Sequence, residues 1–426
     1  MELTILFGVF ALLLAIGTPV AFALFVSTTA TLVYLGLPPL VVVQQSASDI
    51  SSVSLLAIPL FIFAGELMLR GGISERIIAF ASAGVGHIRG GLGQVSVVAS
   101  TLFGGVSGSA IADVTAVGGT MIPQMAARGY EKSYAVNVTI TAALIALLVP
   151  PSHNMILYSA AAGGGISITQ LFAAGIIPAL MMAVTVMITA YVIARRRGYA
   201  ATPFPGFGAV LRTFIAALPG LLLVAIIFVG IKAGIFTAIE SAAIAVVYAV
   251  AVTALVYRHM KWDDFLHACA GAVRTSGHIL LIIGAAGAFG WLMAYLQVPA
   301  QTVDLMQAVA DDKITILLMM VLILLFLGTF MDMAPMIIIA TPIFLPVAKA
   351  YGIDPVHFGV VMILTCGIGL LTPPVGSVLF VGCAIGKISV GEAMKTIWPF
   401  YLAAMIVLLL VTLIPALSLW LPGAML

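Results

Sequence analysis

The sequence predicts an all-α polytopic membrane protein made of two inverted repeats, each with about five membrane crossings and one re-entrant helical hairpin. Three observations support this fold class. The chain is far more apolar than a soluble protein, its apolar stretches have the length of membrane helices, and its second half repeats features of its first half. A duplicated membrane chain with helix-breaking segments at matching places is typical of transporters.

The composition excludes a soluble fold. Of the 426 residues, 63% are hydrophobic and 8% are charged, and the mean hydropathy is +1.26. Apolar stretches close to the ~20 residues of a spanning helix recur along the chain. They lie at residues 3–24, 26–45, 55–69, 133–149, 171–194, 214–231, 239–257, 276–298, 356–372 and 397–420. Because these runs lack the alternating polarity of barrel strands, helices are the expected spanning element.

The charges and cysteines give no sign of a nucleic-acid-binding or metal-binding protein. The net charge is +2 and the basic residues are scattered between apolar segments, so no nucleic-acid partner is expected. Cys269, Cys366 and Cys383 follow no metal-ligand spacing. The N-terminus lacks the basic region of a signal peptide and is expected to remain as a first helix.

The positions of the lysines and arginines predict the topology. If residues 95–125 and 315–345 are re-entrant hairpins and the N-terminus is outside, 14 basic residues fall inside and 3 outside, in agreement with the positive-inside rule. A full crossing at either hairpin would scatter the basic residues over both faces. Each half then has five crossings, an odd number, so the second copy is inverted relative to the first and both termini are expected outside.

The second half repeats the first at an offset of 223 residues. The matched pairs are Phe103 with Phe326, Gly105 with Gly328, Pro123 with Pro346, Gly129 with Gly352, and Pro150-Pro151 with Pro373-Pro374. The expected first repeat covers residues 1–200 and contains a broken helix at about 133–162. The expected second repeat covers residues 208–426, with an interfacial helix at about 258–274 and a broken helix at about 356–386.

Each repeat places a Pro-Pro break beside its hairpin. Pro150 and Pro151 remove two amide donors, so carbonyl groups such as those of Ala146 and Val149 lose their helical partners. The hairpins add glycines and hydroxyls at membrane depth, which are tolerated where they are buried or face a wet cavity. Free carbonyl oxygens suit a hard cation, and half-helix N-termini suit an anion. The second break at the equivalent place favours a binding role over a simple packing kink.

Acidic residues at membrane depth are the next candidates, because buried charge is expensive and usually functional. Asp332, near the second hairpin tip, either binds substrate or an ion, or makes an interior hydrogen bond. Asp113 either contributes to binding or caps and pairs within the first hairpin. Glu66 lies four residues before Arg70, and the two are expected to form an ion pair.

At these residues the chain resembles the large membrane subunit of tripartite ATP-independent periplasmic (TRAP) transporters. The resemblance covers essentially the whole chain and rests on FGGVSGSAIAD, PPSHNMILYS, GTFMDMAPMIIIATPIFLPV and LLTPPVGSVLF. It implies an elevator-type secondary transporter in the bacterial inner membrane, with both termini periplasmic. Na+ is the implied coupling ion, and the implied partners are a small membrane subunit and a periplasmic substrate-binding protein. The implied substrate is a small organic anion, such as a C4-dicarboxylate or a sugar acid like sialic acid.

The resemblance also implies site residues. The implied sodium ligands are Gly105, Ser107, Ala146, Val149 and Pro151 in the first copy, and Gly328, Gly369, Thr372 and Pro374 in the second. The residues implied to face the organic anion are Ser109, Asp113, Ser152, Asn154, Asp332 and Ser377. Neither hairpin carries an arginine for a carboxylate, so hydroxyls, amides, helix N-termini and sodium are expected to balance the negative charge.

Two other functions remain open on the sequence alone. One is a stand-alone sodium or proton symporter of the same architecture, which needs neither partner. The other is an intramembrane serine protease, since residues 105–108 match a GxSG motif and His153 is a possible base for Ser107. The protease leaves the whole second copy unexplained.

Overall fold

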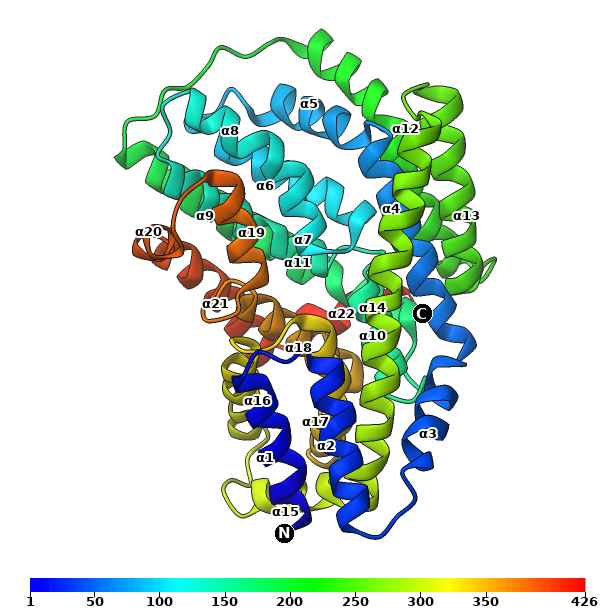
Figure 1. Ribbon diagram of the computed structural model, residues 1–426. Coiled ribbons are helices and arrows are strands. Elements are labelled where there is room, and N and C mark those ends of the chain that lie inside the picture. The colour runs from blue at the N-terminus through cyan, green and yellow to red at the C-terminus, as the bar shows by residue number, and fades with distance from the viewer. Residues whose placement is uncertain (426) are drawn as a thin grey trace.

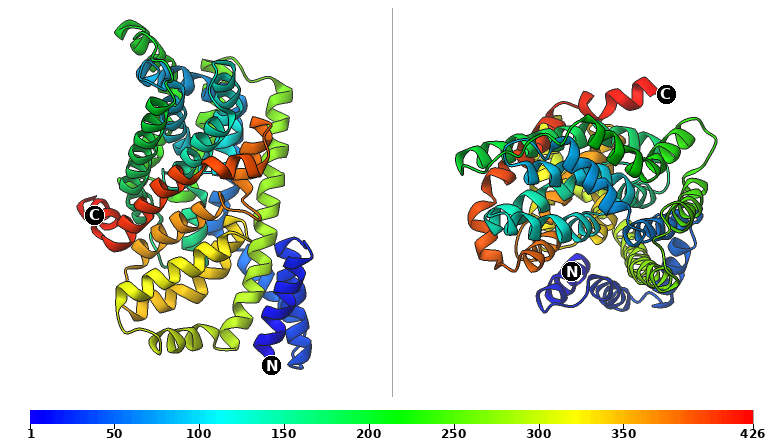
Figure 2. Two further views of the ribbon diagram at one scale, coloured as in Figure 1. Left: turned by 90° about the vertical axis from the view of Figure 1, so that its left-hand side faces the viewer. Right: turned by 90° about the horizontal axis from the view of Figure 1, so that it is seen from above.

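The structure is a computed structural model that describes residues 1–425, and over these residues it consists of helices without strands. Figure 1 shows the first hairpin, from α6 (Gly91–Ser107) to α8 (Gly119–Ala127), in the upper half of the molecule. The second hairpin, α16 (Lys313–Gly328) and α17 (Met333–Ala350), lies in the lower half. The long helix α14 (Trp262–Tyr295) runs along one side of both halves, as the left view of Figure 2 also shows. The ends of the two hairpins meet near the middle of the molecule, where the candidate site lies.

The chain begins with short helices rather than two long crossings. These elements are α1 (Glu2–Ala15), α2 (Val20–Tyr34), α3 (Leu40–Ile50), the 3₁₀ segment η1 (Val53–Leu56), α4 (Ala57–Arg70) and α5 (Ile73–Val85). The expected spans 3–24 and 26–45 are therefore wrong in their boundaries. Gly17 and Gly36 adopt positive φ, and each is followed by proline within two residues, which ends the helices. At 14 residues, α1 is only about 21 Å long, shorter than a ~30 Å hydrocarbon core.

Residues 91–127 fold as two helices that turn back on each other. The elements are α6 (Gly91–Ser107), α7 (Ala110–Asp113), the π-helical segment η2 (Val114–Gly118) and α8 (Gly119–Ala127). Gly108 makes the turn with a φ of 59°, a left-handed conformation that glycine adopts without strain. Ser100 on the first arm donates a 2.6 Å hydrogen bond to Asp113 on the second arm, which ties the arms together.

The next elements complete the first half. They are α9 (Lys132–Ala142), the 3₁₀ segment η3 (Ala143–Leu147), α10 (His153–Ala161) and the 29-residue α11 (Ile168–Arg196). The stretch 148–152 between η3 and α10 is non-helical and contains Pro150 and Pro151. We call this stretch the first break.

The second half contains the remaining helices. They are α12 (Phe207–Lys232), α13 (Ala238–Ala251), the π-helical η4 (Val252–Val256), α14 (Trp262–Tyr295), α15 (Val298–Gln307), α16 (Lys313–Gly328), α17 (Met333–Ala350), α18 (Pro355–Gly369), α19 (Ser377–Gly386), α20 (Val390–Thr396), α21 (Trp398–Leu413) and α22 (Ala416–Met425). The stretch 370–376 separates α18 from α19 and holds Pro373 and Pro374. It is the second break.

The interfacial helix expected at 258–274 is not a separate element. Residues 262–295 form one continuous helix of 34 residues, about 50 Å long. This range contains no proline, so nothing in it stops a helix that has already begun. Asp263 and Asp264 in its first turn also favour its N-terminus electrostatically.

The helices agree with a multi-pass membrane protein but not with ten straight crossings. Five of the described helices are long and apolar enough to cross a membrane, or up to eight if each sharply bent pair is one span. The bent pairs are α4 with α5, α19 with α20, and α21 with α22. The expected span at 55–69 corresponds to α4, the first helix of a bent pair, and the span at 397–420 includes the bend between α21 and α22.

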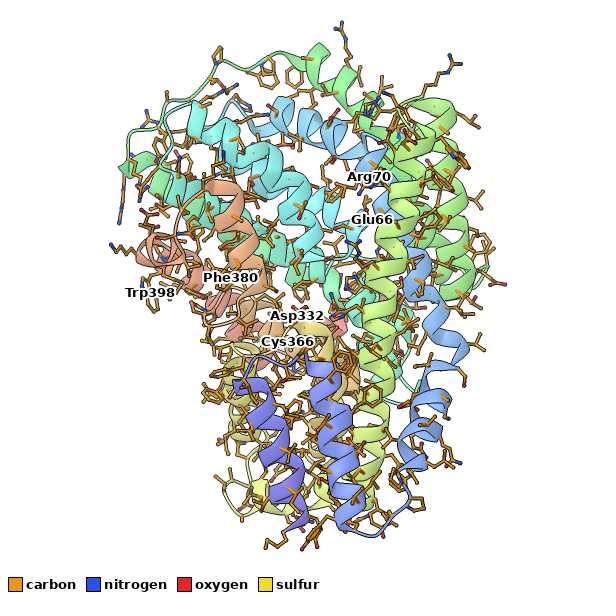
Figure 3. All side chains as sticks on the ribbon, in the orientation of Figure 1. Glu66, Arg70, Asp332, Cys366, Phe380 and Trp398 are labelled. Atoms are coloured by element: carbon orange, nitrogen blue, oxygen red, sulfur yellow. The ribbon has the colours of Figure 1, made fainter. Side chains whose placement is uncertain are left out.

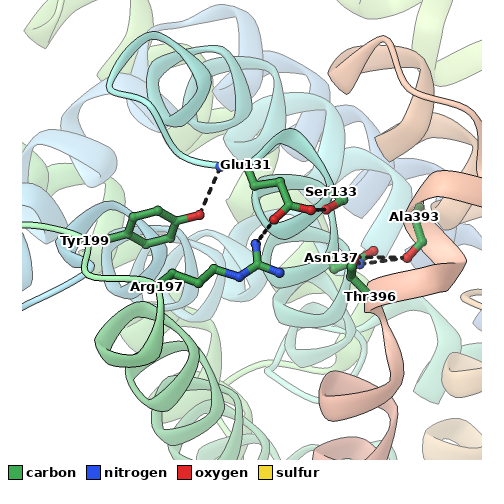
Figure 4. Close-up of polar contacts among 7 residues, drawn as sticks. All are labelled: Glu131, Ser133, Asn137, Arg197, Tyr199, Ala393 and Thr396. Atoms are coloured by element: carbon green, nitrogen blue, oxygen red, sulfur yellow. Dashed lines mark hydrogen bonds and ion pairs between the residues drawn. The ribbon is translucent and has the colours of Figure 1, made fainter.

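Polar contacts connect segments that are distant in sequence (Figure 4). Glu131 forms an ion pair with Arg197, and its backbone N–H donates a 3.0 Å hydrogen bond to the Tyr199 hydroxyl. The amide of Asn137 donates 2.9 Å bonds to the Ala393 carbonyl and the Thr396 hydroxyl. The first contact anchors the linker after α11 to the start of α9, and the second joins α9 of the first half to α20 of the second.

Candidate functional site

The turn of the first hairpin, residues 107–109, packs directly against the first break. A Cβ placed on Gly108 would lie 2.5 Å from the Pro151 carbonyl oxygen, so only glycine fits there. One turn earlier, a Cβ on Gly104 would lie 2.6 Å from the Cα of Ala146. The Asn154 amide reaches back to the Gly108 carbonyl at 3.4 Å. The backbones of tip and break are therefore in contact, with no side chain between them.

The turn of the second hairpin, residues 329–332, packs against the second break in the same way. A Cβ on Gly369 would lie 2.8 Å from the backbone of Gly328. The Val375 N–H donates a 3.0 Å bond to the Thr329 carbonyl. The structure thus places Gly328 beside Gly369, whereas in the first copy Gly104, one residue before the matched Gly105, lies beside Ala146, and Gly105 lies beside the Pro150 carbonyl.

The oxygens at these contacts suit sodium as a ligand set. Pro150 and Pro373 have no N–H to donate to the carbonyls of Ala146 and Gly369, four residues earlier. The Gly369 carbonyl instead accepts a 2.9 Å bond from the Thr372 N–H, which leaves its second lone pair available. Unwound carbonyls of this kind coordinate sodium in transporters with broken helices. The residues present therefore fit the ion that the sequence predicts.

Tyr401 on α21 is a neighbour of the second break that the sequence did not reveal. Its hydroxyl donates to the Leu371 carbonyl and lies 3.0 Å from the Thr372 hydroxyl. The Thr372 hydroxyl itself donates a 3.1 Å bond to the Ile368 carbonyl, so Tyr401 and Ile368 together hold the Thr372 side chain. The 223-residue offset pairs Tyr401 with Pro178, so the repeat itself contained no signal for this contact.

A cavity of about 610 Å³ lies between the two tips, the residues on either side of the first break (Leu147, His153 and Asn154) and the helices α4 and α14. We call it the central cavity. Of the expected substrate residues, Ser109, Asn154 and Asp332 line it, together with the expected sodium ligand Ser107. Figure 3 shows Asp332 near the middle of the molecule, below Glu66 and Arg70 on α4. A cavity of this size, mainly apolar with a few polar groups in its wall, accommodates a small organic molecule.

The other three expected substrate residues are not in the cavity wall. Asp113 is fully buried within the first hairpin and accepts the Ser100 bond. Ser152 is also fully buried and donates a 2.7 Å bond to the Leu147 carbonyl. Ser377, which does not line the cavity, donates a 3.1 Å hydrogen bond to the Asp332 carboxylate. The packing of the helix tips turns these side chains away from the interior of the cavity. Through their hydrogen bonds they instead support the residues that form its wall.

The cavity wall also contains charged residues that were not expected there. Arg274 and His278 on α14 line it, as does Glu66 on α4. The predicted ion pair between Glu66 and Arg70 is confirmed, with 3.5 Å between Oε2 and Nε. The expected interfacial helix would have placed Arg274 on the membrane surface. The four-residue spacing of positions 274, 278 and 282 shows that these residues share one face of a helix.

The geometry at Ser107 does not resemble a serine nucleophile with its base. Among the described residues, the Ser107 hydroxyl donates its hydrogen bond to the Ser109 carbonyl, at 3.5 Å, and not to a histidine. His153 instead lies at the start of α10, in the wall of the central cavity.

Comparisons with known proteins agree with this geometry. The family model described as "Tripartite ATP-independent periplasmic transporter, DctM component" matches residues 7–417. "Uncharacterized protein YgiK" of Salmonella typhimurium is 42% identical, over 98% of this chain and 96% of that protein. The sialic acid TRAP transporter large permease protein SiaM of Vibrio cholerae is 37% identical, over 98% of this chain and 97% of that protein.

A solved structure shares the fold. The YdaH transporter of Alcanivorax borkumensis superimposes with a TM-score of 0.57 at 15% identity, covering 85% of each chain. Members of the matched family are transporters rather than enzymes, and they work with a small membrane subunit and a periplasmic binding protein. The full-length family match and the identity to SiaM establish that the chain belongs to the DctM family, the large membrane subunits of TRAP transporters.

Proposed function

We propose that this chain carries out sodium-coupled uptake of a small organic anion across the bacterial inner membrane. The observation that carries the proposal is the central cavity, where the tips of two hairpins and the residues flanking the first break converge on one space of about 610 Å³. In transporters with discontinuous helices, substrate and coupling ions bind at such a meeting point. Membership of the DctM family supports the same function.

Sodium would bind at the two contacts between tip and break. The first site would use Gly105, Ser107 and the carbonyls of Ala146, Val149 and Pro151. The second would use Gly328, Gly369, Thr372 and Pro374. In support, both contacts are close enough to exclude a Cβ: at Gly104 and Gly108 in the first copy, and at Gly369 in the second.

The organic anion would bind between these sites, against Ser109, Asn154 and Asp332. Asp113, Ser152 and Ser377 would hold the surrounding backbone and side chains in place. The relative in Vibrio cholerae is named for sialic acid, which supports a sugar acid or a C4-dicarboxylate as the substrate class.

Transport would follow an elevator mechanism based on two inverted repeats. A second cavity of about 570 Å³ supports alternating access, because it lies further along α14. It is lined by Ile283, Gly287 and Trp291 of α14, and by Asp49 of α3. The hairpins and breaks would move along α14, between the two cavities, while α14 remains part of a static scaffold.

The partners would be a small membrane subunit that braces the scaffold and a periplasmic protein that delivers the anion. Both chain termini would be periplasmic.

Uptake into proteoliposomes tests the proposal. The chain is reconstituted with and without its small subunit, binding protein and an inward sodium gradient, and a panel of labelled organic acids is offered. Uptake should require all three additions. Uptake by the chain alone would identify a stand-alone symporter, and uptake that responds to neither sodium nor the binding protein would refute the proposed function.

A further inference from the structure

One face of α14 supplies a continuous stripe of side chains to the central cavity. Arg274, His278 and Ile282 are spaced four residues apart, and Thr275 and Ile279 lie beside them. Residues at this spacing lie above one another on a single helix face. The polar part of the stripe, at Arg274 and His278, thus points into the same space as the hairpin tips.

The carboxylates in this cavity are already engaged elsewhere. Glu66 pairs with Arg70 at 3.5 Å, and Asp332 accepts the Ser377 hydroxyl at 3.1 Å. Within residues 1–425, Arg274 has no carboxylate within 4.0 Å and its guanidinium makes no hydrogen bond. The wall from α14 therefore presents an uncompensated positive charge with five free N–H donors.

The part of the wall formed by the hairpin tips has the reverse character. Asp332, on the second tip, faces the cavity with Ser109 and Asn154 near the first tip. A carboxylate placed against Asp332 would be repelled, while hydroxyl and amide groups of a ligand would find hydrogen-bond partners there. The cavity thus has one part of its wall, at the tips, for the polar body of a ligand and another part, at α14, for the ligand's anionic group.

We infer that Arg274 is the carboxylate-binding residue for the transported organic anion, which makes the scaffold helix α14, and not the hairpins, the source of the arginine. This inference rests on the proposed function. The planar guanidinium can hold a carboxylate by two parallel N–H···O bonds, which a lysine cannot reproduce. The ligand is thereby oriented with its carboxylate toward α14 and its hydroxyls toward Ser109 and Asp332.

Binding measurements on the complex of this chain with its small subunit test the inference. The probes are the acid that the unaltered complex transports, taken from succinate, N-acetylneuraminate and 2,3-diketo-L-gulonate, and the methyl ester of that acid. The variants are Arg274→Gln and Arg274→Lys. The matched control is Arg212→Gln, which removes the same charge from an exposed position on α12 outside the cavity.

Arg274→Gln should raise the Kd of the acid about 10- to 100-fold, as expected for the loss of charge-assisted hydrogen bonds. The Kd of the ester should change by less than about threefold, so the preference for the free acid disappears. Arg274→Lys should fall between Gln and the unaltered complex, and Arg212→Gln should leave both values unchanged. A purely structural role for Arg274 would weaken acid and ester equally.

Three results would overturn the inference. If Arg274→Gln keeps both its affinity for the acid and its preference over the ester, the carboxylate binds elsewhere. If acid and ester lose affinity to the same extent, Arg274 supports the fold and does not contact the carboxylate. If the unaltered complex binds none of the three acids, the proposed substrate class itself fails, and the inference fails with it.

Discussion

Gly369 on α18 lies directly against Gly328 at the end of α16, so that a Cβ on Gly369 would come within 2.8 Å of the Gly328 backbone. Backbone atoms cannot move aside as a flexible side chain can. This contact joins the second hairpin to the second break and positions the carbonyls proposed to bind sodium.

Gly369→Ala should therefore separate hairpin and break. We expect a loss of about 1–3 kcal/mol in stability, typical of overpacking, and a weaker stabilisation of the protein by added sodium. Thermal unfolding in detergent over a sodium titration measures both. Gly277→Ala is the control, since nothing lies within 4 Å of a Cβ there. Equal behaviour of the two variants would contradict the tight contact.

Asp332 and Ser377 should differ in their importance for uptake. Asp332→Asn removes a charge from the cavity wall and is expected to lower the initial uptake rate by at least tenfold. Ser377→Ala removes only the supporting 3.1 Å hydrogen bond and should cost about three- to tenfold. Initial rates in proteoliposomes compare the two, with Thr302→Ala on α15 as a control. A larger effect of Ser377→Ala would place the serine in contact with the substrate.

Tyr401→Phe should weaken sodium binding without changing the affinity for the organic acid. The substitution deletes the hydroxyl that contacts Thr372 and the Leu371 carbonyl, while the ring remains packed. The sodium concentration for half-maximal uptake is expected to rise about three- to tenfold. A variant with unaltered sodium dependence would show that Thr372 does not need this partner.

Ser100→Ala should destabilise the first hairpin without altering the affinity for the acid. Its hydroxyl donates the 2.6 Å bond to buried Asp113, whose other carboxylate oxygen has no partner among the described residues. Removing the donor should cost about 1–3 kcal/mol in unfolding free energy. Thermal unfolding and acid binding, measured on the same preparation, separate the two effects. A large increase in the acid Kd at full stability would instead place Asp113 at the substrate.

Features governed by local backbone chemistry were predictable from the sequence. Helices end at Leu147 and Gly369 because proline pairs follow within four residues, and the first tip turns at Gly108 because glycine tolerates positive φ. Ser109 and Asp332 could be assigned to a site because polar groups at membrane depth are costly unless they serve a function.

Features governed by the contact of distant helices were not predictable. Mixed charge in residues 258–274 is typical of a surface helix, and only the packing of α14 shows that Arg274 faces the cavity. Tyr401 has Pro178 at the matched position of the first half, so the repeat gave no indication of its contact with Thr372. Asp113 and Ser152 carry the right chemistry for a ligand, but tip packing directs them into the protein, which a linear pattern does not specify.

Two matched cation sites around one anion cavity should each carry a sodium ion, so the number of sodium ions transported per organic anion is the decisive measurement. The chain, its small subunit and the binding protein are reconstituted in proteoliposomes, and the fluxes of labelled sodium and labelled acid are measured together. With both sites in use, at least two sodium ions should enter per anion, and no uptake should occur when choline replaces sodium. A ratio of one or less, or undiminished uptake in choline, would contradict it.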